Sequence, residues 1–244
     1  MRAPSAAELL DIWEIGASLP PPRRTLLLLA AACPDASGDD LASLPLGRCD
    51  ACLLQLREYL FGDDLTVIAA CPACGAQLES RFQTADIKTS IQPGEQAYTI
   101  RAGGCDVSFR LPAGADLVAV GGSADAGSGR SLLLARCVVE ARNPAGDIVE
   151  PKSLPHEVVA EITARMAVID PQADIRLDLA CPACAHRWQA PFDIAAFLWS
   201  ELQSWARRTL REVHALAHVY GWREADVLAL SPTRRQIYLE LSRQ

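Results

Sequence analysis

The sequence Cys71-Pro72-Ala73-Cys74 and its near-copy Cys181-Pro182-Ala183-Cys184 decide the fold of this 244-residue chain. A Cys-x-x-Cys turn places two thiols on one side of the backbone, at about 2.3 Å from a shared Zn²⁺ ion. Each turn follows a β-leaning segment and precedes an alternating one, with a phenylalanine at the matching position, Phe82 or Phe192. Two such hairpins around one tetrahedral four-thiolate site form a zinc ribbon. We therefore predict a single structural Zn²⁺ ion, bound by Cys71, Cys74, Cys181 and Cys184.

Three other uses of these thiols were weighed. Disulfides suit an exported chain, but residues 1–10 lack the apolar segment of a signal peptide. A thioredoxin-like redox pair needs one Cys-x-x-Cys at the start of a helix, whereas this chain has two copies that each lead into a strand. Inert buried thiols are the third alternative. A catalytic zinc ion is disfavoured because four thiolates leave no coordination position open for water or substrate.

The two cysteine pairs lie far apart in the sequence. Between Cys74 and Cys181 there are 106 residues, against roughly 15–20 in an ordinary zinc ribbon. Closing a loop of that length costs roughly 4 kcal/mol of chain entropy. A structural Zn²⁺ site contributes on the order of 10–16 kcal/mol. The site therefore tolerates the insertion, which we predict to be a folded module.

These features predict an α+β fold, in which helical N- and C-terminal segments surround a zinc ribbon that is split by a small inserted α/β module. The expected regions are residues 1–64 (helical), 65–83 (first hairpin), 84–173 (inserted module), 174–192 (second hairpin) and 193–244 (helical). A capping box at Ser5 and Glu8 begins the first helix, which should end before Pro20. Glycine or proline signals bound the other expected helices, at 24–33, 46–61, 155–169, 194–220, 224–230 and 232–242.

The inserted module shows mixed patterns. Residues 96–101 and 105–111 alternate across Ala102-Gly103-Gly104, which predicts a β-hairpin. Residues 116–120 suggest a helical turn, and the Gly- and Ser-rich residues 121–131 predict a loop. The apolar residues 132–139 fit either a helix or a strand. Gly129-Arg130-Ser131 in this loop is similar to the end of a phosphate-binding loop. The pattern is not met, because Ala124 stands where it has its first glycine and Arg130 stands where it has a lysine.

Several other residues could carry chemistry. Cys49 and Cys52 form a third Cys-x-x-Cys, but inside a helix and without a partner pair, so we expect them to pack, as we expect of Cys33, Cys105 and Cys137. His214 and His218 have the spacing of metal ligands but lack a Glu-x-x-His partner, and His186 should only flank the second knuckle. Large aromatics fill a core or dock on a partner. We predict partner contacts at Trp199, Trp205, Tyr220, Trp222 and Tyr238.

The composition limits the functions and the cellular compartment that we expect for this chain. The net charge of −7 and the pI near 5.1 argue against nucleic-acid binding, which needs a basic surface. Nine cysteines without an export signal fit a reducing cytoplasm. The longest apolar stretch, residues 26–33, is far shorter than the roughly 18 residues that span a bilayer, so we expect no membrane segment.

Several stretches together resemble one known family. They are Leu9-Leu10-Asp11-Ile12-Trp13-Glu14, the two Cys-Pro-Ala-Cys knuckles, Phe109-Arg110-Leu111-Pro112, Glu212-Val213-His214-Ala215-Leu216-Ala217, Tyr220-Gly221-Trp222 and the segment from Arg234-Arg235 to Tyr238-Leu239. The chain resembles the T-even-type phage baseplate protein family of contractile-tailed phages, prophages and related contractile injection systems. The resemblance implies a structural or assembly protein of the baseplate hub that has no enzymatic activity or small-molecule substrate. It also implies contacts with other baseplate proteins, either as an assembly factor in the cytoplasm or as part of the finished particle.

Two further functions were considered. Zinc ribbons often bind nucleic acid or act in regulation, but residues 70–83 and 180–193 contain only Arg81 and Arg187 as permanent positive charges. A metalloenzyme would have to use His186, His214 and His218. One departure within the knuckles is Ala185, which stands where the first knuckle has Gly75. If that position is left-handed, the alanine costs about 1 kcal/mol, but no ligand is lost.

Overall fold

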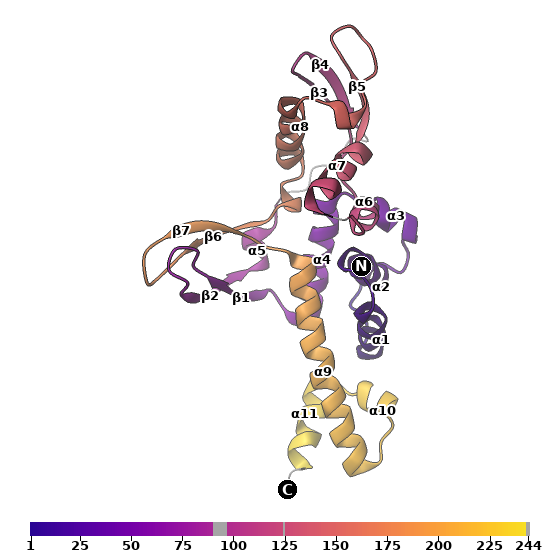
Figure 1. The fold of residues 1–244 in the computed structure, drawn as a ribbon. Coiled ribbons are helices and arrows are strands. Elements are labelled where there is room, and N and C mark those ends of the chain that lie inside the picture. The colour runs from indigo at the N-terminus through magenta and orange to yellow at the C-terminus, as the bar shows by residue number, and fades with distance from the viewer. Residues whose placement is uncertain (90–96, 124, 243–244) are drawn as a thin grey trace.

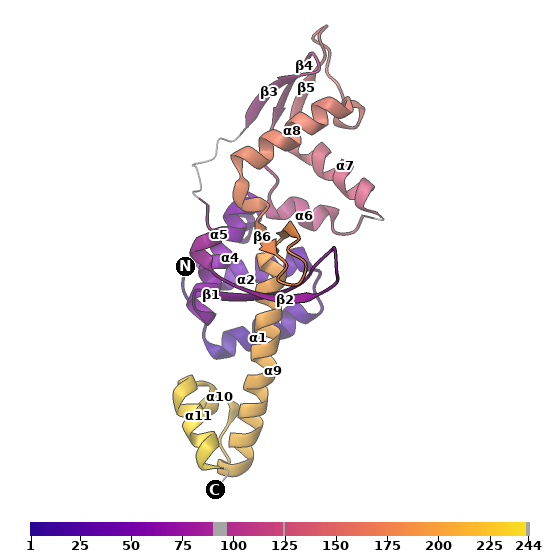
Figure 2. The same ribbon diagram turned by 90° about the vertical axis from the view of Figure 1, so that its left-hand side faces the viewer.

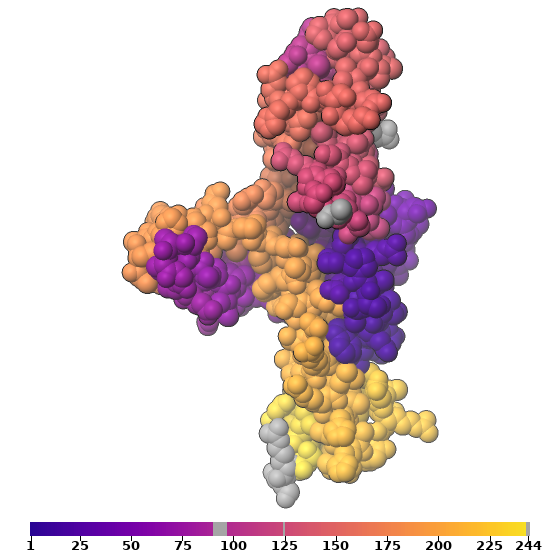
Figure 3. All heavy atoms as spheres, viewed as in Figure 1, coloured from indigo at the N-terminus to yellow at the C-terminus, as the bar shows by residue number. Residues whose placement is uncertain are grey.

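The structure is a computed structural model that describes residues 1–89, 97–123 and 125–242. It combines helices with three small antiparallel sheets, which confirms the predicted α+β class. The molecule is elongated, with the inserted module at one end and the C-terminal helices at the other (Figure 1). The two cysteine hairpins project from its middle as a side arm, in which they lie against each other (Figure 3).

Four helices form the N-terminal region: α1 (Ala6–Ala17), α2 (Pro21–Ala32), α3 (Gly38–Ser43) and α4 (Leu46–Phe61). The capping box of α1 is formed, because the Ser5 side chain accepts from the backbone N–H of Glu8 and the Glu8 side chain accepts from that of Ser5. Helix α2 begins earlier than predicted, at Pro21, because the fixed φ of proline suits the first helical position. Gly62 ends α4 with a positive φ of 86°, a conformation that favours glycine.

The two hairpins are β1 (Asp64–Ala70) with β2 (Gln77–Gln83), and β6 (Arg176–Ala180) with β7 (Arg187–Pro191). Each hairpin directs alternate side chains inward, since successive residues of a strand point to opposite faces. Leu65 stands opposite Phe82 in the first hairpin, and Leu177 stands opposite Ala190 in the second. Phe82 and Phe192, the matching aromatics of the two copies, meet edge to face at 5.8 Å.

The inserted region contains a three-stranded sheet in the order β3-β4-β5. Its elements are α5 (Thr84–Ile87), β3 (Tyr98–Ala102), β4 (Cys105–Phe109), α6 (Gly114–Val120), α7 (Ala126–Cys137), β5 (Val138–Arg142), η1 (Pro151–Ser153), α8 (His156–Ile169) and η2 (Pro171–Ala173). The predicted hairpin is present across Gly103 and Gly104, although Gln96 lies outside the described residues.

The stretch after α6 differs from the sequence-based expectation. Helix α7 occupies part of the predicted loop at 121–131, and the side chain of Asp125 caps it by accepting from the backbone N–H of Ser128. The ambiguous residues 132–139 divide between the end of α7 and the start of β5. Ala124, which replaces the first glycine of the phosphate-loop pattern, lies outside the described residues.

The C-terminal region is dominated by the 27-residue helix α9 (Ile194–Tyr220), followed by α10 (Glu224–Leu228) and α11 (Pro232–Leu241). Gly221 ends α9 in the left-handed conformation and Ser231 caps α11, as the sequence predicts. Figure 2 shows α9 running from the centre of the molecule to its C-terminal end. One helix therefore connects the body to the terminal helices.

Within the part of the chain that the structure describes, the buried apolar residues form three clusters. The first joins the N-terminal helices, both hairpins and the first half of α9, and includes Leu54, Leu65 and Leu198. The second lies within residues 98–169 and includes Phe109 of β4 together with Val158 and Ile162 of α8. The third is small, with Val213, Leu216 and Val227 between α9 and α10. Helix α5 belongs to the first cluster through Ile87, and α6 packs against α2 and α3, so the module has its own core only from β3 to α8.

Two polar contacts bind distant segments to this framework. The guanidinium of Arg57 on α4 donates two hydrogen bonds to the carboxylate of Glu201 on α9, at 3.0 and 2.9 Å. At the end of the inserted region, the Asp170 carboxylate accepts from the backbone N–H of Gly47 at 2.9 Å. A Cβ atom at position 47 would lie 1.8 Å from an Asp170 oxygen, so only glycine permits this approach.

Candidate metal centre

The two Cys-Pro-Ala-Cys turns have the same backbone structure. In the first, the N–H of Gly75 donates to the carbonyl of Cys71 at 2.9 Å, and the N–H of Cys71 donates to the carbonyl of Ala76 at 2.9 Å. In the second, the corresponding bonds run from Ala185 to Cys181 at 2.9 Å and from Cys181 to His186 at 2.8 Å. The local sequence thus folds each knuckle in the same way at the tip of its hairpin.

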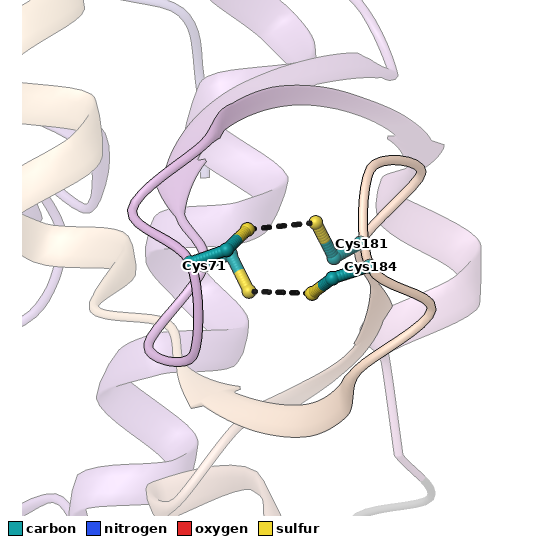
Figure 4. Close-up of side chains that lie close together, drawn as sticks. Cys71, Cys181 and Cys184 are labelled. Atoms are coloured by element: carbon teal, nitrogen blue, oxygen red, sulfur yellow. Dashed lines mark hydrogen bonds between the residues drawn. The ribbon is translucent and has the colours of Figure 1, made fainter.

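The knuckles face each other and bring their four sulfur atoms together (Figure 4). The Sγ atoms of Cys71 and Cys184 are 3.7 Å apart, those of Cys74 and Cys181 are 3.6 Å apart, and all four lie within 4.8 Å of one another. Tetrahedral coordination with Zn–S bonds of about 2.3 Å places neighbouring sulfurs about 3.8 Å apart. The sulfur positions therefore fit one tetrahedral ion.

Exposure divides the four thiols into two kinds. Cys71 and Cys181, the first cysteine of each knuckle, are buried, whereas Cys74 and Cys184 are exposed. The cluster thus lies at the surface of the arm, with one buried and one exposed sulfur from each hairpin. An ion could enter without unfolding either hairpin, and it would complete the contact between them.

Backbone N–H groups favour the thiolate form of these cysteines. The N–H of Cys184, followed by that of Ala183, holds the pKa of the Cys181 thiol at about 7. At Cys184 the N–H of His186 acts in the same direction, but the neighbouring sulfurs, first that of Cys74, raise the pKa of Cys184 to about 12. Four thiols this close cannot all lose their protons unless a cation balances the charge, which is the chemistry of a metal site.

The other candidate ligands do not assemble a second site. Within the described residues, the four cysteines are the only group of three or more His, Cys, Asp or Glu side chains close enough to hold an ion. His186 stacks on Trp188 at 5.9 Å, and His214 stacks on His218 at 6.4 Å along α9. Cys49 is buried in α4, and burial above all raises the pKa of its thiol to about 12, which is the character of a packing residue. Cys105 and Cys137 are likewise buried, and Cys33 and Cys52 are half-buried against the first core.

The aromatic residues predicted to contact partners fall into two groups. Trp199 is only 8% exposed and packs beneath Arg24, whose guanidinium lies 4.8 Å from the ring centre. Its burial against α1 and α2 contradicts a surface role, because the ring fills the first core; Trp205 is half-buried against the same core. Near the end of α9, Tyr220 instead stacks on Trp222 at 4.8 Å, and Tyr238 meets both rings edge to face at 5.9 and 4.8 Å; Tyr220 is 36% exposed.

Two antiparallel hairpins from distant parts of the sequence bring four cysteine sulfurs together. This arrangement defines a protein whose two hairpins could hold one metal ion between them. Residues 23–199 match the family described as T4 bacteriophage base plate protein, and the matched region contains all four cysteines. The chain belongs to this family, which confirms the resemblance seen in the sequence. No curated protein and no solved structure matches the chain. Among the described residues, no helix is both long and apolar enough to cross a membrane.

Proposed function

We propose that this protein is a structural or assembly protein of the baseplate of a contractile tail or injection system, without enzymatic activity. In this proposal a single structural Zn²⁺ ion, held by Cys71, Cys74, Cys181 and Cys184, completes a zinc ribbon. The ribbon then serves as a scaffold for contacts with other baseplate or hub proteins. The observation that carries the proposal is the meeting of four sulfurs from two hairpins in a chain of the baseplate family.

The proposed ion has a structural task. The two hairpins flank the inserted region, so an ion between them would fix both ends of that region to the arm. Four thiolates close the coordination sphere, which suits stability and leaves no position for a reacting molecule. The two halves of the chain would then be held in one arrangement, which a scaffold for partner proteins requires.

Partner contacts are proposed for the C-terminal helices. Tyr220, Trp222 and Tyr238 form a partly exposed aromatic group there, and aromatic side chains often dominate protein interfaces. Trp205, half-buried where α9 leaves the body, borders this region, whereas Trp199 belongs to the core. The protein would meet its partners in the cytoplasm during assembly and would either leave afterwards or remain in the particle.

Zinc-dependent nucleic-acid binding or regulation is the alternative, and the charges on the arm disfavour it. On the outer face of the first hairpin, Arg81 donates two hydrogen bonds to Glu79, at 2.9 and 2.8 Å. At the base of the second, Arg176 pairs with Asp174 at 2.9 Å. Arg81 and Arg176 are thus balanced by carboxylates, and of the described hairpin arginines only Arg187 has no carboxylate partner, so the arm offers little charge to phosphates.

Metal analysis of the purified full-length protein tests the zinc site. We expect one zinc per chain, and we expect its loss in the double variant Cys71→Ser/Cys181→Ser. The matched control is Cys33→Ser/Cys52→Ser, which removes two thiols outside the cluster and should retain the zinc. Zinc retained by the first variant, or lost only in the control, would refute the assignment of the four ligands.

Co-purification tests the proposed role. The full-length protein, expressed together with the products of its neighbouring genes, should be recovered bound to at least one other baseplate protein. Binding that is reduced by Tyr220→Ala/Trp222→Ala, with zinc content unchanged, would support the C-terminal helices as the contact. A protein that binds none of these products but shifts DNA or RNA in a salt-dependent manner would favour the alternative.

A further inference from the structure

The second half of α9 carries two arginines and two histidines on its exposed side. Arg207, Arg211, His214 and His218 are spaced by four, three and four residues, which places them on one face of the helix. All four are exposed. Among the described residues, neither Arg207 nor Arg211 forms an ion pair, whereas the adjacent Arg208 reaches Glu212 at 4.0 Å. Of these residues only the two arginines are permanently charged, and we call the surface that Arg207 and Arg211 form the cationic stripe.

The distribution of charge along the chain makes this stripe unusual. Residues 205–244 contain seven arginines and four acidic residues, a net charge of +3. Since the whole chain has 23 basic and 30 acidic residues, residues 1–204 contain 16 and 26, a net charge of −10. The cationic stripe is therefore a positive surface on a protein that is otherwise strongly negative, and it will attract acidic surfaces.

Helix α1 offers an acidic face that matches the stripe. Asp11 and Glu14 are exposed on the side of α1 opposite its buried residues, and Ile15, one turn after Asp11, is 55% exposed. Neither carboxylate forms an ion pair among the residues that the structure describes. The rise between Asp11 and Glu14 is about 4.5 Å and that between Arg207 and Arg211 about 6 Å, so two helices side by side can pair these charges. We call Asp11, Glu14 and Ile15 the acidic face.

We infer that two copies of this chain associate through these surfaces, with the acidic face of each copy packed on the cationic stripe of the other. Helix α1 lies beside α9 (Figure 1, Figure 2), so each copy can offer one surface of each sign to its partner. Nucleic acid is a poorer occupant, because the net charge of −10 on the remaining residues repels a polyanion. The inference goes beyond the proposed function and does not depend on the metal.

Sedimentation velocity of the full-length zinc-loaded protein tests the association. Over a series of concentrations we expect a dimer in 50 mM NaCl, with a dissociation constant about tenfold or more higher in 500 mM NaCl, where exposed charges are screened. A protein that sediments as a monomer at every concentration in both salts would overturn the inference. So would a dimer whose dissociation constant is the same in both salts.

Charge reversal identifies the surfaces. Arg207→Glu/Arg211→Glu and Asp11→Arg/Glu14→Arg should each raise the dissociation constant by about tenfold or more, because like charges then face each other. The protein that combines all four changes has exchanged its charges and should recover dimerisation. The control Arg130→Glu/Arg165→Glu reverses two exposed arginines on other helices and should leave the dimer intact. A four-fold variant that dimerises no better than the double variants would contradict the pairing, as would loss of the dimer in the control. Circular dichroism of each variant shows whether it remains folded.

Discussion

At the scale of single residues, Ala185 and Gly75 occupy the same place in the two knuckles and differ by one methyl group. Both are left-handed, with φ values of 59° and 74°. For a residue with a side chain, the left-handed conformation costs about 1 kcal/mol, whereas glycine adopts it without this cost. A Cβ atom at Gly75 would have no heavy atom within 4 Å, so the difference between the positions is one of backbone conformation alone.

We predict that Ala185→Gly raises the free energy of unfolding by about 0.5–1 kcal/mol, because it relieves the left-handed strain. The reciprocal change Gly75→Ala should lower it by a similar amount. Denaturant unfolding of the zinc-loaded proteins measures both. If Ala185→Gly destabilises the protein, the entropy of glycine in the unfolded chain outweighs the strain and the argument fails.

A second residue, Asp50, is a carboxyl group in an unfavourable environment. It lies near the start of α4, beside an open groove of about 490 Å³ between α2, α4 and α9. Burial, followed by the charges of Asp193 and Asp170, raises its pKa to about 7. The folded protein therefore holds the proton of Asp50 more tightly than the unfolded chain, in which the pKa of an aspartate is about 3.9.

Because the folded pKa is the higher one, the stabilising effect of the protonated group is complete below about pH 4 and is lost as the pH rises through about 7. We predict that Asp50→Asn, which cannot ionise, is more stable than the native protein at pH 8 by about 2–4 kcal/mol. The advantage should shrink as the pH falls towards 5. Urea unfolding of both proteins from pH 5 to pH 8 measures the difference, and an advantage that does not change with pH would contradict the prediction.

The sequence revealed the residues of the metal site better than those of the ion-pair networks. A knuckle is a local motif, so Cys71 and Cys181 can be recognised from their immediate neighbours. The carboxylate of Asp116, by contrast, is buried between two arginines. It pairs with Arg110 at 2.6 Å and with Arg136, which is twenty residues further along the chain, at 2.8 Å. Burial alone would raise the pKa of Asp116, but these arginines and the N–H of Ala113 lower it to about 2. No local sequence pattern predicts an ion pair between residues this far apart.

At the scale of elements, the contact between α1 and α9 depends on a glycine. A Cβ atom at Gly16 would lie 2.4 Å from the ring of Trp199, so the two helices approach too closely there for a side chain. The contact also explains why Trp199 is buried rather than exposed. The aromatic pattern of α9 could not show this, because the partner surface belongs to another helix.

We predict that Gly16→Val lowers the free energy of unfolding by about 1–3 kcal/mol, because the added methyl groups overpack the contact with Trp199. Tryptophan fluorescence should show the altered environment of the ring. Gly38→Val is the control, since a Cβ atom at this exposed position of α3 meets nothing within 4 Å. An equal loss of stability in both variants would mean that the helical propensity of valine, rather than packing, causes the effect.

The elements that the sequence predicted best are those with clear end signals. Helix α1 begins at its capping box, and α9 ends at Gly221. The start of α7 was missed because its Gly- and Ser-rich beginning has low helix propensity, which the Asp125 cap and the surrounding structure overcome. Residues 132–139 could not be assigned to helix or strand, because the end of α7 and the start of β5 follow each other directly in one apolar stretch. The partner strand β4, some thirty residues earlier, determines the conformation of β5.

At the scale of the whole molecule, the separate cores predict what loss of the metal would change. The module from β3 to α8 has its own buried cluster, whereas the hairpins bury their inner faces only against each other and the body. We predict that a strong chelator speeds amide hydrogen exchange in residues 65–83 and 175–191 by about tenfold or more. Residues 98–109 should keep their protection.

Hydrogen exchange followed by mass spectrometry measures both regions in one experiment. Chelator added to the Cys71→Ser/Cys181→Ser variant is the control and should have no further effect, since that variant already lacks the site. Faster exchange across all three cores at once would show that the ion stabilises the whole chain as one cooperative unit. The sequence predicted the two separated hairpins. It did not predict that α9 contributes residues to two cores, the first with the N-terminal helices and the third with α10, because this depends on packing between distant segments.

The wide separation of the two knuckles also has a consequence for biosynthesis. At about 5–20 residues per second, a ribosome needs roughly 5–20 seconds to make the 106 residues between Cys74 and Cys181. During that interval the nascent chain has only two of the four sulfurs that later meet between the hairpins. The inserted module, whose core lies within residues 98–169, can fold before the second hairpin leaves the exit tunnel. Joining of the hairpins is therefore a late step of maturation, and if the proposed zinc ion binds there, the time of its binding sets when the arm becomes rigid.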